Sequence, residues 1–318
     1  MSTYRRLLRE AAGVSPSQLA HVGRRVAEQL DACPWLVEEI EGIAKGAGQD
    51  PCELLAVNAR TELLGPMQEG ECSLVAWTRG DDVGLAQNWD WHPALASAAV
   101  VITTARDDGS WFTTLTEAGI VAKLGLNSSG LAVGLNFLTC SEDGGLDGLP
   151  VHVLLRRLLE ECTDSLSALE LLLGARVSAS AAVTVAAAEE AGSAVFTAEL
   201  SPAGPAIAWL EDEWLVHTNH FLAGPAGGVD TQPSLFPSTL LRREHLLRRI
   251  RHGAAVPEVL AEHFPRGQAI CRHDGPVGPW AEERETLASV MMDLRPPALR
   301  VAAGPPCRTP YAPVALPT

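Results

Sequence analysis

The chain changes character at residues 70–77, which read GECSLVAW. A short polar lead-in ends at Cys72, and the apolar run that follows it is typical of a buried β-strand. A second β-prone segment closes fifteen residues after Cys72 with QNWDW at residues 87–91. We hypothesise that the chain cuts its own peptide bond between Glu71 and Cys72. Cys72 would then become an N-terminal residue whose thiol attacks amides or thioesters.

The two sides of this stretch predict different structures. Residues 1–65 read as helical, because apolar residues between Leu30 and Ala44 recur at helical spacing, and Asp50-Pro51 is a typical helix start. From Cys72 onward, short apolar runs separated by turn residues predict antiparallel strands. We place these strands at 72–77, 83–88, 98–104, 111–116, 120–126 and 131–137.

The second half of the chain mixes the two patterns. We expect helices at 149–162, 165–174 and 237–263, the last with Arg242 and Arg243 on a solvated face. Further strands are expected at 181–188, 194–200, 206–210, 213–218, 286–293 and 298–303. The Pro-rich tail, 305–318, is expected to be poorly ordered. Runs of strands and runs of helices predict one α+β domain with stacked antiparallel sheets.

Composition limits the classes of function. The 318 residues are 47% apolar and 20% charged, which suits one large globular domain. A net charge of −15, from 39 acidic and 24 basic residues, disfavours a nucleic-acid partner, which needs a basic surface. The sequence also lacks a signal-peptide core and any apolar run of the ~18–20 residues that span a bilayer, so we expect no membrane partner.

The cysteines indicate a reducing compartment. The chain has 7 of them, an odd number, and no pair has CxxC spacing. This pattern predicts free thiols rather than a disulfide framework or a zinc site. We therefore expect a cytoplasmic protein with no metal and no cofactor.

An N-terminal cysteine carries its own general base. Its thiol is a strong nucleophile once deprotonated, and its α-amino group has a pKa of roughly 8. The chemistry also needs a group that orients the amine and donors that face the developing oxyanion. Asp90 ends a strand that could lie beside the Cys72 strand, so it is a candidate for the first role. Asn136 and Asn219 each end an apolar run and are candidate oxyanion donors.

Each of these residues also has an ordinary structural interpretation. A cysteine at the start of an apolar run is commonly a small buried hydrophobe, and Asp90 could cap a turn. An asparagine after a strand is commonly a turn residue. His217 and His220 could bind a metal, but no third ligand is evident in the sequence.

Taken together, six ordered motifs resemble one family. They are EIEGIAKGA at 39–47, LAVNARTELL at 55–64, QNWD at 87–90, TEAGI at 116–120, KLGLNSSG at 123–130 and HTNH at 217–220. Their order resembles the acyl-coenzyme A:6-aminopenicillanic acid acyltransferase (isopenicillin N acyltransferase) family of N-terminal-nucleophile hydrolases, peptidase family C45. The resemblance runs from about residue 35 to residue 295.

The resemblance implies a fold and a processing event. The fold would be a four-layer αββα sandwich of stacked antiparallel sheets. The precursor, a zymogen, would cut itself into a small helical α chain, residues 1–71, and a β chain, residues 72–318. The catalytic part of the β chain would be residues 72–304, followed by the tail, and the two chains would remain associated as one structural domain.

The resemblance also implies roles for particular residues. Cys72 would be the nucleophile, with its own amine as base, and Asp90 would orient that amine. Asn219 would form the oxyanion hole, and Asn136 would be a further active-site amide. Arg284 is the counterpart of the arginine that precedes the late strand in the family.

Two positions depart from the family pattern. Glu71 stands where the penicillin enzyme has glycine, and its carboxylate could slow the cut without preventing it. Gln87 stands where bile-salt hydrolases have arginine, which disfavours a bile-acid conjugate as substrate. We expect Gln87, Trp89, Glu117 and His220 to line the substrate pocket. A coenzyme A thioester is possible as a co-substrate on family analogy alone.

The sequence therefore favours a self-processed amidase or acyltransferase that acts on a small N-acyl amide or acyl thioester through an acyl-Cys72 intermediate. Two alternatives remain open. One is an uncut hydrolase in which Cys72 works with His217 or His220. The other is a catalytically silent small-molecule-binding relative, in which Cys72 stays blocked behind an uncleaved 1–71 segment.

Overall fold

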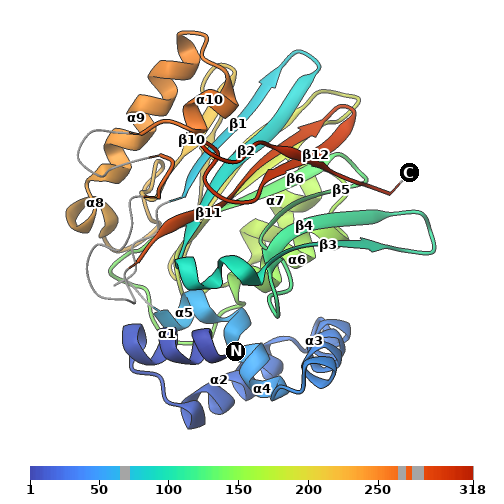
Figure 1. Cartoon of the computed structure of the whole chain (residues 1–318), viewed down its shortest axis with the longest axis vertical. Helices are drawn as coiled ribbons and strands as arrows, with labels where there is room; N and C mark the ends of the chain where they lie inside the picture. Colours follow the sequence, from blue (N-terminus) through green and yellow to red (C-terminus); the bar gives the residue numbers. More distant parts are fainter. Residues whose placement is uncertain (65–71, 264–269, 274–282, 318) are drawn as a thin grey trace.

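A computed structural model describes residues 1–64, 72–263, 270–273 and 283–317. Glu71, on the acyl side of the expected cleavage site, lies outside the described residues. Two antiparallel sheets form the centre of the molecule, and helices cover them (Figure 1). The α+β class expected from the order of strands and helices is therefore confirmed.

The first sheet contains the strand that follows Cys72. Its strands lie in the order β10-β1-β2-β11-β12-β13. Their bounds are β1 (Ser73–Arg79), β2 (Asp82–Trp91), β10 (Trp214–His217), β11 (Glu285–Leu294), β12 (Pro297–Ala302) and β13 (Ala312–Val314).

Residues along β1 alternate between two apolar cores, as the two-residue period of a strand requires. Cys72, Leu74 and Ala76 pack toward the second sheet. Val75 and Trp77 pack instead against α9 (Ser238–Arg251) and α10 (Val256–Leu260). The Cys72 side chain therefore belongs to the space between the sheets.

The second sheet completes the sandwich. Its strands run in the order of the sequence, from β3 to β9. They are β3 (Ala99–Ala105), β4 (Trp111–Glu117), β5 (Leu124–Asn127), β6 (Leu131–Phe137), β7 (Ala181–Ala187), β8 (Ala194–Ser201) and β9 (Gly204–Trp209). Helices α6 (Val151–Glu161) and α7 (Ser165–Gly174) pack on its outer face through a second apolar core. The layers are thus helix, sheet, sheet and helix, as expected.

The N-terminal segment forms its own helical cluster at one end of the sandwich (Figure 1). Its helices are α1 (Ser2–Ala12), α2 (Pro16–Gln29), α3 (Pro34–Ala47), α4 (Pro51–Asn58) and α5 (Arg60–Leu64). Their apolar faces share a core that also takes in Val121 and Val153 from the later part of the chain. The helical expectation for residues 1–65 is confirmed for the described residues 1–64.

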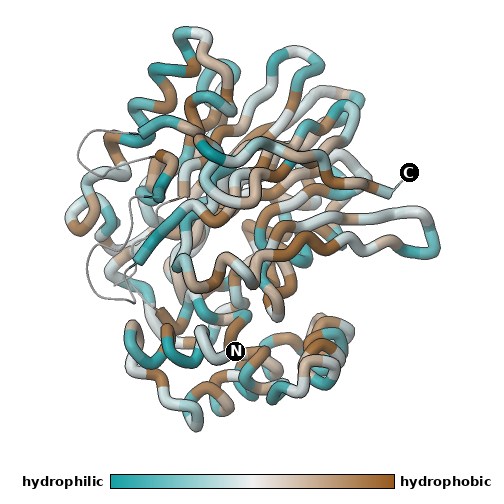
Figure 2. Tube along the Cα trace, viewed as in Figure 1, coloured by the Kyte–Doolittle hydropathy of each residue, from teal (hydrophilic) through white to brown (hydrophobic). Residues whose placement is uncertain are grey.

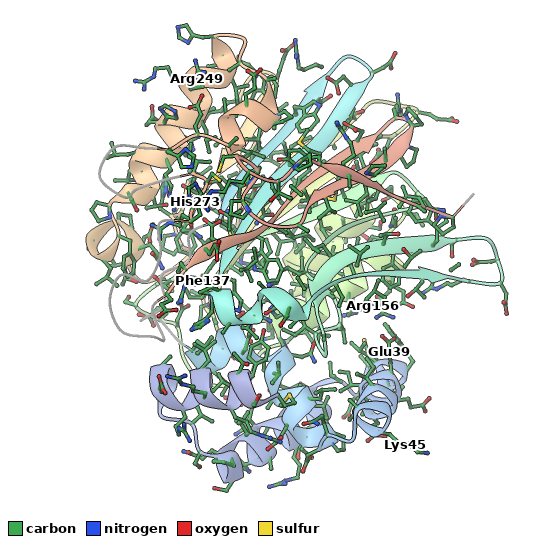
Figure 3. All side chains as sticks on the ribbon, viewed as in Figure 1. Glu39, Lys45, Phe137, Arg156, Arg249 and His273 are labelled. Atoms are coloured by element: carbon green, nitrogen blue, oxygen red, sulfur yellow. The ribbon has the colours of Figure 1, made fainter. Side chains whose placement is uncertain are left out.

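Polar contacts also join this cluster to the sandwich. The side chain of Asn58 accepts a hydrogen bond from the Val121 amide at 3.0 Å and donates one to the Gly119 carbonyl at 2.9 Å. Arg156 of α6 makes a two-pronged ion pair with Glu39 of α3, at 2.8 and 2.7 Å (Figure 3). Contacts of this kind fix residues 1–64 on the sandwich.

The structure corrects the expected helix at 237–263. Residues 238–260 form two helices, α9 and α10, because Gly253 lies between them with a φ of +86°, which ends a right-handed helix. The short helices α8 (Gln232–Leu235) and η2 (Pro93–Ala98) were not expected.

Two further expectations need correction. The strand expected at 120–126 begins only at Leu124, since the preceding residues turn at Gly119, where φ is +94°. The Pro-rich tail is ordered at 312–314, where β13 pairs with β12 in the register Val301↔Ala312. A proline is tolerated there because β13 is the edge strand of its sheet.

Hydrophobic residues concentrate on the strands and on the inward sides of the helices (Figure 2). Within the described residues, no helix has both the length and the apolar character needed to cross a membrane.

Candidate active site

A small cavity lies beside Cys72. Its volume is about 60 Å³, well below the ~300–1,000 Å³ of typical ligand sites. Four of the residues singled out in the sequence line it: Cys72, Gln87, Trp89 and Asp90. Arg60 and Leu64 of α5 form part of the same wall, so the N-terminal segment contributes to the site.

Cys72 sits immediately before β1, and only 8% of its surface is exposed. Burial raises the pKa of its thiol to about 11, and the nearby charge of Asp90 acts in the same direction. In the uncut chain the thiol is therefore protonated at neutral pH and needs a base before it can attack.

Asp90 reaches this site through the pairing of β1 with β2. The register Ser73↔Asn88 brings the end of β2 beside the start of β1, as the sequence suggested. One carboxyl oxygen, Oδ1, accepts a hydrogen bond from the Thr286 hydroxyl at 2.6 Å. The other, Oδ2, is buried and has no hydrogen-bond partner among the described residues.

Burial also makes Asp90 a weak acid. It raises the pKa of the carboxyl to about 7, although the Thr286 hydrogen bond and the Arg242 charge partly offset the effect. A carboxyl with this pKa can accept or release a proton near neutral pH. Oδ2 is the atom that is available to a neighbouring donor.

Arg242 contacts the same site, contrary to the expectation that it lies on a solvated face. It is 1% exposed, and its guanidinium donates to the Cys72 carbonyl at 2.9 Å and to the Ser73 hydroxyl at 3.0 Å. Its other terminal nitrogen donates to Asn219 Oδ1 at 2.9 Å. A planar, always charged donor is suited to join two acceptors in this way.

Asn219 is oriented by this contact. Because arginine only donates, the amide oxygen of Asn219 must face Arg242. Its Nδ2 donates to the Phe137 carbonyl at 3.0 Å, and no acceptor for its second N–H is found among the described residues. Asn219 itself does not line the cavity. The amide is fully buried. This geometry suits a preorganised donor for negative charge.

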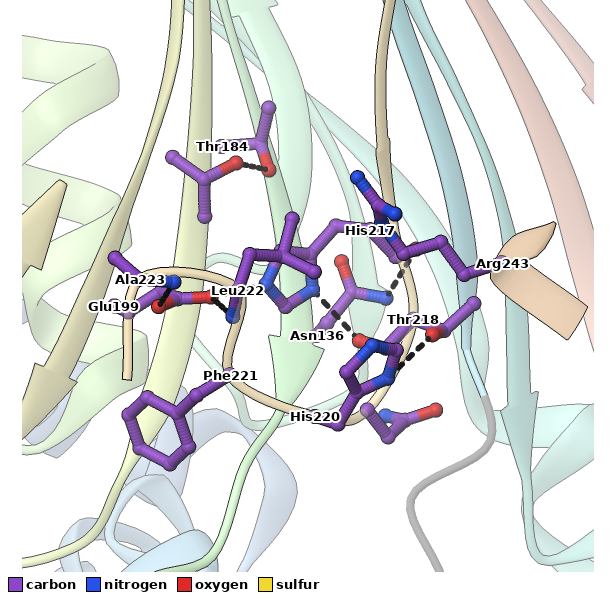
Figure 4. Close-up of polar contacts among 12 residues, drawn as sticks. Asn136, Thr184, Glu199, His217, Thr218, His220, Phe221, Leu222, Ala223 and Arg243 are labelled. Atoms are coloured by element: carbon purple, nitrogen blue, oxygen red, sulfur yellow. Dashed lines mark hydrogen bonds and ion pairs between the residues drawn. The ribbon is translucent and has the colours of Figure 1, made fainter. Parts of the chain in front are cut away.

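Asn136 lies on β6 and faces the first sheet. Its Nδ2 donates a long hydrogen bond, 3.4 Å, to the His217 carbonyl, and its Oδ1 has no partner among the described residues (Figure 4). Asn136 is buried but does not line the cavity beside Cys72.

The two histidines are committed to other contacts (Figure 4). The ring nitrogens of His217 face the Thr218 carbonyl at 2.7 Å and the Glu199 carboxylate at 2.9 Å. His220 bonds the hydroxyls of Thr218 and Thr239 through Nδ1, and burial lowers its pKa to about 3. Neither ring lines the cavity. This arrangement favours neither His217 nor His220 as the base for the thiol, and it does not support a pocket role for His220.

Glu117 lies behind the cavity rather than in its wall. Its buried carboxylate pairs with Arg60 at 2.8 Å and with Lys123 at 2.6 Å, and it accepts a hydrogen bond from the Tyr4 hydroxyl. The two cations do line the cavity, and the Lys123 ammonium lies 3.6 Å from the centre of the Trp89 ring. Burial and the charge of Arg60 lower the pKa of Lys123 to about 7.

Three cavity residues carry no signal of a role in the sequence: Arg60, Lys123 and His152. His152 also lines the cavity, and its Nδ1 lies 2.9 Å from the Ala122 carbonyl. That contact requires the proton on Nδ1, so Nε2 is a bare acceptor in the neutral ring. The Nη1 atom of Arg60 and the Nε2 atom of His152 are buried without a partner among the described residues.

Gln87 lines the cavity, but its side-chain amide already makes hydrogen bonds to the protein backbone. Both of its polar atoms bond the backbone of Leu135 on β6, with the Leu135 amide donating to Oε1 at 3.1 Å. Gln87 therefore links the two sheets, and Trp89 supplies an apolar wall.

Arg284 lies outside the cavity lining. Its guanidinium stacks 5.2 Å from the centre of the Trp91 ring and donates to the Glu283 carbonyl at 2.7 Å. Among the contacts that the structure describes, Arg242 is the arginine that bonds the Cys72 carbonyl.

If the chain cuts itself before Cys72, as the sequence predicts, replacing Arg242 with lysine is expected to slow that cut at least ~10-fold. Lysine offers one nitrogen in place of the two guanidinium nitrogens that separately bond the Cys72 carbonyl and Asn219, so the amide loses part of its fixed orientation. The rate would be followed by intact mass after expression is induced. Arg243→Lys is a matched control, because Arg243 is more exposed and bonds the Val216 carbonyl instead. Equal rates in the two variants would contradict the role given to Arg242.

Comparison with known proteins identifies related chains. Residues 77–251 match the family model described as acyl-coenzyme A:6-aminopenicillanic acid acyl-transferase. The 40 kDa form of acyl-coenzyme A:6-aminopenicillanic-acid-acyltransferase from Emericella nidulans is 34% identical over 222 residues. That alignment covers 67% of this chain and 60% of the relative.

A solved structure supports the fold. A mutant of the conjugated bile acid hydrolase from Clostridium perfringens superposes with a TM-score of 0.51 at 11% identity. The match covers 77% of this chain and 96% of that one. At this identity the likeness concerns the arrangement of sheets and helices alone.

Proposed function

This chain belongs to the acyl-coenzyme A:6-aminopenicillanic acid acyl-transferase family, and we propose that it is a self-processing amidohydrolase or acyltransferase with Cys72 as its N-terminal nucleophile. The observation that carries the proposal is the shared cavity of Cys72 and Asp90, in which Asp90 keeps a buried oxygen without a described partner.

The first step is the cut. Cys72 Sγ attacks the carbonyl carbon of Glu71 while Asp90 accepts the thiol proton. The C–N bond breaks as the nitrogen of Cys72 takes up a proton, which leaves residues 1–71 attached to the sulfur as a thioester. Water then hydrolyses the thioester and releases the carboxyl group of Glu71 and the free thiol.

The second step uses the new amine. The Oδ2 atom of Asp90, which has no partner in the described part of the chain, offers the amine an acceptor that orients it toward the thiol. The amine takes the thiol proton as Sγ attacks the substrate carbonyl, and it returns a proton to the leaving amine. If the substrate is a thioester, the leaving group is a thiol. Water or an acceptor amine then removes the acyl group from Cys72.

Negative charge on the tetrahedral intermediate requires a donor. The second N–H of Asn219 is the candidate, since Arg242 fixes the orientation of its amide. The removal of one such donor typically costs ~10²–10³ in rate.

The cavity favours a small acyl group with an apolar body. Trp89, Trp91, Leu135 and Phe137 supply apolar walls, and the Arg60 and Lys123 side chains add positive charge. The present volume is too small for most acyl compounds, so the side chains of the wall must move, or the cut must open the cavity, before substrate enters.

A trapping experiment tests the proposal. Freshly purified protein is mixed with 4-nitrophenyl esters of acids from acetate to octanoate, and intact mass is recorded within seconds. We expect the fragment that begins at Cys72 to gain the mass of one acyl group, located on Cys72 by peptide mapping. Cys52→Ser, which changes a cysteine on α4, should label equally. An adduct at another cysteine, or none while ester is consumed, would contradict the proposal.

A further inference from the structure

We propose that His263, Cys271, His273 and Cys307 form a zinc-binding site. The structure brings one ligand atom from each residue within 4.8 Å of all the others. The four come from three segments: His263 from the turn after α10, Cys271 and His273 from residues 270–273, and Cys307 from the stretch between β12 and β13. None of them lines the cavity beside Cys72.

The donor set matches the preference of zinc. Two thiolates and two imidazoles make a Cys₂His₂ set, in which the two negative charges balance Zn²⁺. With Zn–S of ~2.3 Å and Zn–N of ~2.0–2.1 Å, tetrahedral ligand atoms lie about 3.3–3.8 Å apart. The observed spread of up to 4.8 Å is therefore close to a closed four-ligand site.

The histidine pair already faces a common point. Nε2 of His263 and Nε2 of His273 are 2.7 Å apart, and the rings meet edge to face with centroids 4.8 Å apart. A zinc ion bound to both nitrogens would replace this contact and move them apart by a further ~0.6 Å, to the ~3.3 Å of a tetrahedral site. The Sγ atoms of Cys271 and Cys307 also lie within 4.8 Å of each other. Zinc would take both as thiolates and release their protons.

One neighbouring group opposes the metal. The guanidinium of Arg308 contacts Nδ1 of His273. A histidine bound to zinc through Nε2 keeps its proton on Nδ1, so it cannot accept from arginine at the same time. Arg308 is exposed and can turn into solvent when the metal binds.

Zinc at this site would hold residues 270–273 in place, and these residues help to position Asp90. Residues 270–273 lie beside β11, where the Thr286 amide donates to the Arg272 carbonyl at 2.9 Å and the Arg272 amide donates to the Thr286 hydroxyl at 2.8 Å. That hydroxyl in turn donates to Asp90. With ligands at Cys271 and His273, zinc would fix the residue between them, and so the Thr286 hydroxyl.

A second contact strengthens this link. The side chain of Asn88 donates to the Ile270 carbonyl at 2.8 Å, which ties the same segment to β2 beside Asp90. His273 lies on the side of the sandwich that carries α9 (Figure 3). The metal site itself does not depend on the proposed function, whereas its effect on Asp90 does.

Metal content of the whole protein gives the first test. The chain is expressed with added zinc, desalted, and analysed by inductively coupled plasma mass spectrometry. We expect about one zinc per chain in the wild type and less than a tenth of that in Cys307→Ser. Cys307 is exposed, so its replacement should leave the fold intact. Cys52→Ser, at another cysteine that is not fully buried, should keep its zinc.

Cobalt(II) gives a second readout that does not depend on activity. Protein stripped with a chelator under reducing conditions should bind one Co²⁺ and develop thiolate-to-metal absorption in the near ultraviolet, and Cys307→Ser should lose most of it. The proposal is overturned if reduced, folded protein takes up neither ion. It is also overturned if the two cysteines are joined as a disulfide and reduction does not restore binding. These results would not decide whether the chain cuts itself before Cys72, which is tested separately.

Discussion

Cys72→Ala is expected to abolish turnover, with a loss on the order of 10⁴–10⁶ in kcat, as when other covalent nucleophiles are removed. The alanine has no sulfur to form the acyl intermediate, and no other cysteine lines the cavity as the structure describes it. The fold should tolerate the change, since Cys72 packs as a small apolar group between the sheets. Hydrolysis of an acyl substrate and the unfolding temperature would be measured together.

Cys162→Ala is the control for this prediction. Cys162 is also buried, with a thiol pKa that burial raises to about 11, but it packs against α6 and α7, away from the cavity. The control should keep its activity even if it loses some stability. Turnover by folded Cys72→Ala within tenfold of the wild type would show that another group performs the attack.

Asp90→Asn is expected to slow the self-cleavage ~10²–10⁴-fold and to change its dependence on pH. With Asp90 as base, the rate rises with pH and levels off near 7, the pKa of its carboxyl. The amide cannot accept the thiol proton. The rate in the variant should then follow the thiolate of Cys72, whose pKa burial still holds above its usual value, and should keep rising above pH 7 instead of levelling off there.

The measurement is the appearance of the fragment in purified precursor between pH 5 and pH 10. Thr286→Ser serves as a matched control, because it keeps the hydroxyl that donates to Asp90. An unchanged pH profile in Asp90→Asn would remove Asp90 from the role of base.

The raised pKa of Asp90 also predicts how the free energy of unfolding depends on pH. Its pKa is raised in the folded chain, so the folded state holds this proton more tightly than the unfolded state does. This group is therefore expected to make the fold less stable as pH rises from about 4 to about 7, and to have little further effect above that range. Asp90→Asn should flatten that part of the unfolding profile.

Short apolar runs separated by turn residues predicted the centre of the site well. The runs after Cys72 and before Asp90 are apolar and β-prone, and a tight turn joins them, so an antiparallel pair was the simple expectation. The register Ser73↔Asn88 confirms it. Such contacts are local in the sequence, which is why they can be inferred from it.

Arg242 was misjudged from its charge alone. Its spacing held the correct signal, because Arg242, Leu246 and Ile250 recur every four residues and share the buried face of α9. Charged residues are rarely fully buried unless they are paired. The charge of Arg242 therefore predicted an exposed side chain, although its helical spacing predicted a buried one. The partner here is the backbone of Cys72, which the sequence could not place beside α9.

The cluster at His263, Cys271, His273 and Cys307 was beyond sequence analysis for a different reason. Its cysteines are 36 positions apart, and no short ligand motif joins them. Only the folding of residues 270–273 and of the stretch after β12 onto the same place brings the four side chains together. The expectation of no metal site rested on spacing, which does not report such tertiary contacts.

The cut itself is the claim on which the account depends. Intact mass of freshly purified wild-type protein beside Cys72→Ala tests it most directly. We predict two fragments from the wild type, separated between Glu71 and Cys72, and one chain of 33.7 kDa from the variant. A wild-type chain that remains whole at 33.7 kDa while it turns over acyl substrate would contradict the account.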